Sequence, residues 1–135
     1  MFKFSFGVCI IVLGLVHLAY FGQSQGVWTL QTGAAWPQGS WVVANLLDAR
    51  TARLVASGAS FLAALGYLFG GLGMFAEGRS WRLLVGGAGM LSTTMFVMYW
   101  DGGMQHLNDQ GGIVVLANLA VMVAVLILRW PDFRY

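Results

Sequence analysis

The sequence predicts an all-α polytopic membrane protein: a bundle of four transmembrane helices, with a short interfacial helix in the first outer loop. The 135-residue chain is 59% hydrophobic and 9% charged, whereas soluble domains carry about 25% charged residues. Four long apolar runs fill most of the chain, and none contains an acidic residue. Each approaches the roughly 20 residues that a helix needs to cross a hydrocarbon core. Backbone groups in lipid must pair within their own segment, so the runs should be helices.

The four runs are Phe4–Phe21, Leu54–Phe75, Leu83–Trp100 and Ile113–Trp130. The longest stretch between them, Gly22 to Arg53, has about 30 residues and is too short for a soluble catalytic domain. We therefore expect a single four-helix domain over residues 1–135. The first run follows Lys3 as in a secretory signal, but it is long and lacks a small-x-small cleavage site at its end. A retained signal-anchor helix is the interpretation we adopt.

The loop between the first two runs contains a second, shorter helix signal. Residues Ser40 to Asp48 are too apolar for a fully solvated loop, and Ser40 could cap a helix there. This segment is expected to lie on the outer membrane surface or over the mouth of the bundle. Asp48 could form an ion pair with Arg50 or Arg53 that braces the loop. The same residues could instead hold an anionic headgroup or a quinone carbonyl.

Small residues gather in the second and third runs. Gly66 and Gly70 form a GxxxG motif, and four small residues, Gly86 to Gly89, lie near the start of the third run. Because small faces let helix backbones approach closely in lipid, these two helices are expected to pack together. Dimerisation through the same face is the alternative.

The charged residues indicate an orientation. With alternating segments, five basic residues fall on one side and two on the other, which places both termini in the cytoplasm by the positive-inside rule. The majority side holds Lys3, Arg79, Arg82, Arg129 and Arg134, and the other holds Arg50 and Arg53. The basic residues are scattered, so nucleic acid is not expected as a partner.

The polar residues of the runs and loops converge on the predicted outer mouth, which makes it the candidate ligand site. Intramembrane polar groups are costly and are often functional. The candidate ligand-binding residues are His17, Asp48, Arg53, Asp101, His106 and Asn118.

His17 is the most suggestive of these residues because apolar neighbours surround it in the first run. It could contact a substrate headgroup, relay a proton or ligate a metal. Alternatively it bonds Asn118, Asp101 or a backbone carbonyl and packs the bundle. His17 and His106 could in principle bind a haem axially, but nothing else in the sequence supports haem, and no metal-ligand spacing is present. Cys9 is the single cysteine, so disulfide exchange within the chain is excluded.

Several reaction classes have no signature in the sequence. No run carries a charged residue near its centre, where a proton-coupled exporter would need a carboxylate. There is no nucleophile elbow for serine hydrolysis and no glycine-rich phosphate loop. Whether the chain is an enzyme stays open at this point.

The layout resembles that of the DoxX-like group of small bacterial membrane proteins. The resemblance rests on four helices, a long first outer loop, and the glycine-rich hairpin from Ala63 to Gly73 followed by Arg79-Ser80-Trp81-Arg82. It implies the bacterial cytoplasmic (inner) membrane and a role in quinone-linked oxidoreductases or redox-stress membrane complexes.

From the residues and this resemblance together, we expect a small non-catalytic subunit or scaffold of a membrane complex that binds quinone or lipid at its outer mouth. Its partner would be another membrane protein or a second copy of the chain. The alternatives are a membrane redox subunit with chemistry at His17, Asp101 and His106, or a small-molecule carrier.

Overall fold

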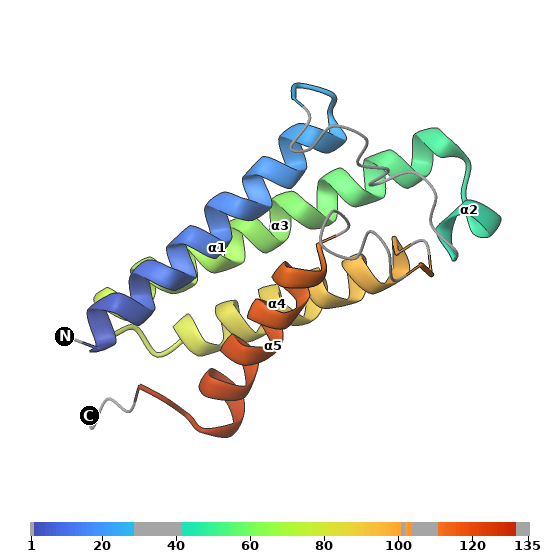
Figure 1. Cartoon of the computed structure of the whole chain (residues 1–135). Helices are drawn as coiled ribbons and strands as arrows, with labels where there is room; N and C mark the ends of the chain where they lie inside the picture. Colours follow the sequence, from blue (N-terminus) through green and yellow to red (C-terminus); the bar gives the residue numbers. More distant parts are fainter. Residues whose placement is uncertain (1, 29–41, 101, 104–110, 132–135) are drawn as a thin grey trace.

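The computed structural model describes residues 2–28, 42–100, 102–103 and 111–131, and the regular structure of these residues is helical, without strands. In Figure 1 the longer helices pack together, and a short helix lies at the end opposite the chain termini. The elements are α1 (Phe2–Ser24), α2 (Val43–Leu46), α3 (Ala49–Phe75), α4 (Trp81–Met98), α5 (Gly112–Met122) and a π-helical segment (Val123–Ile127).

The start of α3 differs from the predicted one because a polar cap extends the helix beyond its apolar run. Helix α3 begins five residues earlier than Leu54, because the Asp48 side chain accepts hydrogen bonds from the N–H groups of Arg50 and Thr51. The expected helix over Ser40 to Asp48 is shorter in the structure. It spans Val43–Leu46 and is preceded by Val42, which makes no side-chain cap. Ser40 lies outside the described residues.

The last helix ends before the predicted Trp130. The N–H of Leu128 donates to the carbonyl of Val123, which widens the final turn into a π-helix. Arg129 then adopts a positive φ of 49°, with which a right-handed helix cannot continue.

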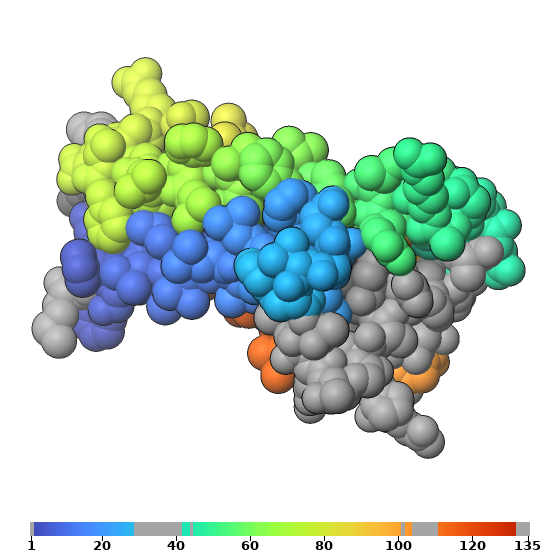
Figure 2. All heavy atoms as spheres, turned by 90° about the horizontal axis from the view of Figure 1, so that it is seen from above, coloured from blue at the N-terminus to red at the C-terminus, as the bar shows by residue number. Residues whose placement is uncertain are grey.

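The helices are arranged in the order α1, α3, α4, α5, and neighbours in this order pack on each other. Figure 1 shows α5 in front of α4, and Figure 2 shows α1 and α3 packed along their length with the first turns of α3 projecting past the end of α1. The Phe6 and Trp130 rings meet at 4.8 Å, so the start of α1 and the end of the last helix share one end of the bundle.

The described basic residues lie towards the two ends of the bundle. Arg82 donates to the carbonyls of Arg129 and Pro131, which places the start of α4 beside the end of the chain. Arg50 and Arg53 lie in the first turns of α3, at the opposite end. Arg134 lies outside the described residues.

The predicted packing of the two glycine-rich helices is confirmed. A Cβ at Gly66 would lie 2.8 Å from the Ala88 Cβ, and one at Gly70 would lie 2.5 Å from Val85 Cγ2. Both glycines therefore face α4. Close approach of the α3 and α4 backbones depends on the missing side chains.

The exterior is far more apolar than that of a soluble domain. Large apolar side chains cover the outside, among them Leu83 at 76% exposed and Ile127 at 73%. The interior has an apolar core as well, and it also encloses polar side chains, namely His17, Ser24, Ser57, Ser60, Ser92 and Asn118. By length and composition, α1 and α3 are able to cross a membrane, and the apolar helix over Gly112–Ile127 is shorter.

Candidate functional site

His17 lies in the interior of α1, about two turns before its end at Ser24, because α1 continues beyond the predicted limit of Phe21. The imidazole is completely buried. Its Nδ1 lies 2.6 Å from the Leu13 carbonyl oxygen one turn earlier, and its Nε2 lies 2.5 Å from the Ser92 hydroxyl of α4. Both ring nitrogens are thus engaged by the protein itself.

Ser92 connects His17 to two further buried side chains. The Asn118 amide nitrogen donates to Ser92 Oγ at 2.7 Å, and the Tyr67 hydroxyl donates to Asn118 Oδ1 at 2.7 Å. We call His17, Ser92, Asn118 and Tyr67 the central network. It takes one side chain from each of α1, α4, α5 and α3, and all four are fully buried.

The hydrogen bonds of the central network run in one direction. A peptide carbonyl only accepts, so the proton of a neutral His17 sits on Nδ1 and is donated to Leu13. Nε2 then accepts from the Ser92 hydroxyl, whose oxygen accepts from Asn118. A protonated imidazole would also donate to Ser92 and leave that hydroxyl hydrogen without an acceptor in the network. The neutral ring therefore satisfies every member.

This geometry suits a clamp between helices better than a reaction centre. The Ser92–His17 pair has the composition of a nucleophile and base, but the third partner is a carbonyl, where hydrolytic triads place an acid. No network side chain lines the pocket beside the start of α3 or the groove between α1 and α5 that are described below. The Tyr67 ring packs 5.2 Å from the imidazole and closes the site further.

Of the predicted site residues, the structure joins His17 and Asn118, through Ser92. Asp48 and Arg53 lie elsewhere: Arg53 precedes Tyr67 by fourteen positions on α3, which is about 21 Å along the helix. Asp101 and His106 lie outside the described residues. Within the described ranges no group of three or more His, Cys, Asp or Glu side chains could hold a metal.

Asp48 caps α3 and is not paired with an arginine. Its Oδ1 accepts from the Thr51 hydroxyl at 2.5 Å, and its Oδ2 accepts from two backbone N–H groups. The bonds from Thr51, and then that from the N–H of Arg50, hold the pKa of this carboxyl below its ordinary value. The expected bracing ion pair with Arg50 or Arg53 is replaced by a helix cap.

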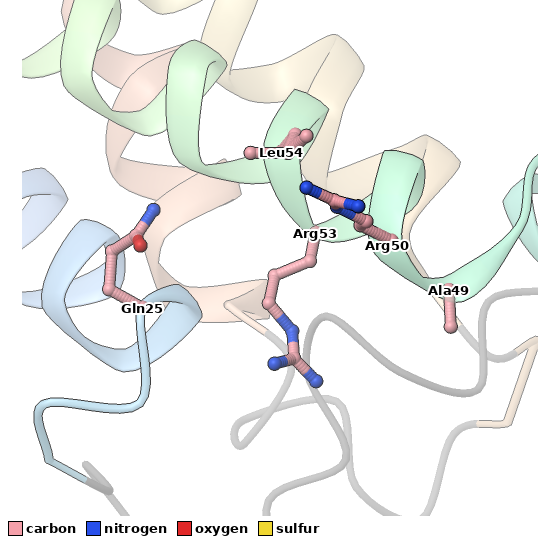
Figure 3. Close-up of a pocket in the computed structure, with 5 residues that line it drawn as sticks. All are labelled: Gln25, Ala49, Arg50, Arg53 and Leu54. Carbon is pink, nitrogen blue, oxygen red and sulfur yellow. The ribbon is translucent and has the colours of Figure 1, made fainter.

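A pocket of about 250 Å³ opens beside this cap, between the end of α1 and the start of α3. Figure 3 shows its five lining side chains, with the arginines on α3 and the glutamine directly after the end of α1. The lining residues are Gln25, Ala49, Arg50, Arg53 and Leu54. The amide nitrogen of Gln25 donates to Ser57, which fixes the position of this side chain. We call this feature the arginine pocket.

A second opening lies between α1 and α5, with a volume of about 490 Å³. Its walls are apolar apart from the thiol of Cys9, and we call it the apolar groove. It is lined by Phe6, Val8, Cys9, Val12, Leu13, Ala117, Ala120 and Val121. The groove occupies the half of α1 that carries the N-terminus, so it does not lie at the predicted outer mouth.

Sequence reasoning missed Ser92 and Tyr67. Both sit in apolar runs where a serine or tyrosine is common, and neither carries a charge. A signal was present in α4, because Gly86, Gly89 and Ser92 recur every three residues on one face. A polar residue on a face of glycines has room to meet another helix. Tyr67 lies between Gly66 and Gly70 of the GxxxG motif, and the packing prediction used only these two glycines.

A scan against models of protein families finds no match to this chain, and searches of curated proteins and of solved structures also find none.

Proposed function

We propose that the chain is a multi-pass integral membrane protein with four spans. The observation that carries this proposal is the apolar exterior, on which large leucine, isoleucine and phenylalanine side chains are exposed, over an interior that also encloses serine, histidine and asparagine. A soluble protein would lose free energy on both counts, since exposed apolar surface is costly in water and buried polar groups must be satisfied. In lipid the same arrangement is favourable.

Within the bilayer, we infer a role as a small non-catalytic subunit or scaffold of a membrane complex, as the DoxX-like layout suggests. The sealed central network supports a structural role for His17. A haem or metal would have to displace Leu13 or Ser92 from a ring nitrogen that is already bonded. The cytoplasmic membrane, with both termini inside, is the location that the separated basic residues favour.

The ligand of this subunit is proposed to be an extended hydrocarbon chain, which belongs either to a phospholipid or to a quinone tail. The apolar groove is the feature that supports it. In a bilayer, a groove of about 490 Å³ with apolar walls fills with hydrocarbon, not with water. The proposed ligand position thus shifts from the outer mouth to the face between α1 and α5.

Native mass spectrometry of the protein, gently extracted from its own membrane, tests the subunit role. A stable partner polypeptide or a retained quinone mass is the expected result. A bare chain that carries only bulk phospholipid would contradict the subunit role and leave a stand-alone protein.

Cys9 can report on what fills the apolar groove, since it is the single cysteine and is exposed in this groove. A fluorophore attached to Cys9 should be quenched by lipids brominated in the middle of the acyl chain. A label at Leu83→Cys in a Cys9→Ala background marks an open face of α4 as the control. Excess quinone should reduce quenching at Cys9 and leave the control label unchanged if a quinone tail occupies the groove. Quenching by aqueous iodide alone would contradict a hydrocarbon-filled groove.

A further inference from the structure

Two arginines occupy the first turns of α3, where positive charge is least favourable. Arg50 and Arg53 are three positions apart, so their side chains leave the same face of the helix. The N-terminus of a helix already carries a partial positive charge, and basic residues are stabilising only at the opposite end. Repulsion between the arginines and with the helix dipole favours an anion at this position.

The described part of the chain does not supply that anion. It contains two acidic residues, Asp48 and Glu77, and Glu77 lies at the opposite end of the bundle. Both oxygens of Asp48 are used by the cap, and within the described ranges no ion pair joins this carboxylate to Arg50 or Arg53. Both arginines are solvent-exposed and can reorient towards a ligand.

The arginine pocket offers the space for such a ligand. A single water needs only about 10–15 Å³ of comparable space, so a pocket of about 250 Å³ admits a phosphate group with its hydrating water. Guanidinium groups bind phosphate oxygens through two parallel N–H bonds. Gln25 adds an amide whose position is fixed by its bond to Ser57, and Leu54 adds an apolar side chain to the lining (Figure 3).

We infer that the arginine pocket binds the phosphate group of an anionic phospholipid. The inference rests on the proposed membrane location, which sets Arg50 and Arg53 at headgroup depth, within reach of lipid phosphate groups. It also explains why two arginines stand on the side that the positive-inside rule leaves poor in positive charge. The same phosphate chemistry could be supplied by free phosphate, and the two sources can be separated by experiment.

The test uses delipidated full-length protein in a neutral detergent. Its Tm is followed while dioctanoyl phosphatidylglycerol, dioctanoyl phosphatidylcholine or inorganic phosphate is added, because a ligand that binds only the folded state raises Tm with its concentration. The variant Arg50→Gln/Arg53→Gln removes both cations. Arg79→Gln/Arg129→Gln removes the same charge from exposed positions at the opposite end, and Arg53→Gln alone serves if the double variant folds poorly.

Phosphatidylglycerol should stabilise the wild type and the Arg79/Arg129 variant at the same half-maximal concentration. The Arg50/Arg53 variant should need about 30-fold more, if each arginine contributes about 1 kcal/mol. Equal responses of the two double variants would overturn the inference. So would a response that emerges only after Asp101→Asn/Asp109→Asn, because a carboxylate of the chain would then be the natural partner.

Protection by inorganic phosphate at the same concentration would support the phosphate site and overturn the lipid as its source. Carbonate extraction of the expressed protein separates failure of the inference from failure of the proposed function. A chain released into the supernatant contradicts the membrane location itself. A chain that stays in the pellet but ignores phosphatidylglycerol contradicts the arginine pocket alone.

Discussion

The centre of the bundle and the start of α3 both gather polar side chains, but they treat them in opposite ways. In the central network each of the four polar groups is bonded to the next, and all are closed off from solvent. At the start of α3 the carboxylate is used by the backbone, while two guanidinium groups stay exposed beside a pocket. Saturated polar groups hold helices together, and polar groups left open are available to a ligand.

The comparison separates two properties that look alike in a sequence. His17 is a single ionisable residue in an apolar run, which suggests chemistry, yet its bonds are complete within the protein. Arg53 is an ordinary residue at a helix start, yet within the described residues no carboxylate pairs with its charge. Completeness of hydrogen bonding, and not rarity of residue type, divides structural from ligand-binding roles here.

A substitution that pushes α4 away from its neighbours at the central network should cause the largest loss of stability. A Cβ at Gly89 would meet Met122 Cγ at 2.7 Å and the Tyr67 hydroxyl at 3.1 Å, whereas Gly87 faces open space. Gly89→Leu is therefore expected to lower the free energy of unfolding by about 3 kcal/mol, and Gly87→Leu to leave it nearly unchanged. Unfolding in detergent, followed by circular dichroism, compares the two. Equal losses would show that α4 packs on its neighbours through a different face.

Removing Asn118 should have the next largest effect. Asn118→Leu deprives Tyr67 of its acceptor and Ser92 of its donor, at an expected cost of about 2 kcal/mol. Tyr67→Phe on its own removes one bond, and the two substitutions together should cost less than their sum because they break a shared bond. Additive losses in this double-mutant cycle would mean that the Tyr67–Asn118 bond contributes nothing to stability. Leu119→Ala, on the exposed side of α5, is the control.

Ser92→Ala should cost about 1 kcal/mol, which is typical of one interhelical hydrogen bond in lipid. It leaves His17 Nε2 and the Asn118 amide without their shared partner. Thr94→Ala, an exposed position two residues further along α4, provides the reference. If Ser92→Ala abolished a measured activity while Tm stayed at the wild-type value, the clamp interpretation would be wrong and the Ser92–His17 pair would be a reaction centre.

The smallest expected effect concerns the Asp48 cap. The pKa of this carboxyl is lowered in the folded protein by its bonds to Thr51. Its contribution is therefore complete above the unfolded value of about 4 and is lost as pH falls through the lower folded value. Asp48→Ala should lower Tm slightly at pH 7, and the difference from wild type should shrink below about pH 4. A difference that grows on acidification would contradict the cap.

Much of the fold follows from the apolar runs, because their length and the exclusion of acidic residues determine where helices form. The glycines of the second and third runs also indicated which two helices meet, since Gly66 and Gly70 leave room for Ala88 and Val85. The helix ends were harder to predict, because Asp48 extends α3 and a π-turn ends the last helix early.

The central network could be predicted only in part. The sequence singles out His17 by its isolation in an apolar run and predicts Asn118 as one of its partners. The bridge through Ser92, however, depends on the rotation of α4 about its axis. One apolar run does not determine that angle. The apolar groove was not predicted. It forms between α1 and α5, which are far apart in the sequence, so the pattern of one segment does not indicate it.

Substituted-cysteine labelling in a Cys9→Ala background tests most directly whether the bundle spans the membrane with its two ends on opposite sides. Gly78→Cys lies in the α3–α4 turn and Gly26→Cys in the turn after α1, at opposite ends of the bundle. In intact cells, a membrane-impermeant maleimide should label position 26 and reach position 78 only after lysis. Labelling of both positions in intact cells, or of neither, would contradict a bundle with its two ends on opposite sides of the membrane.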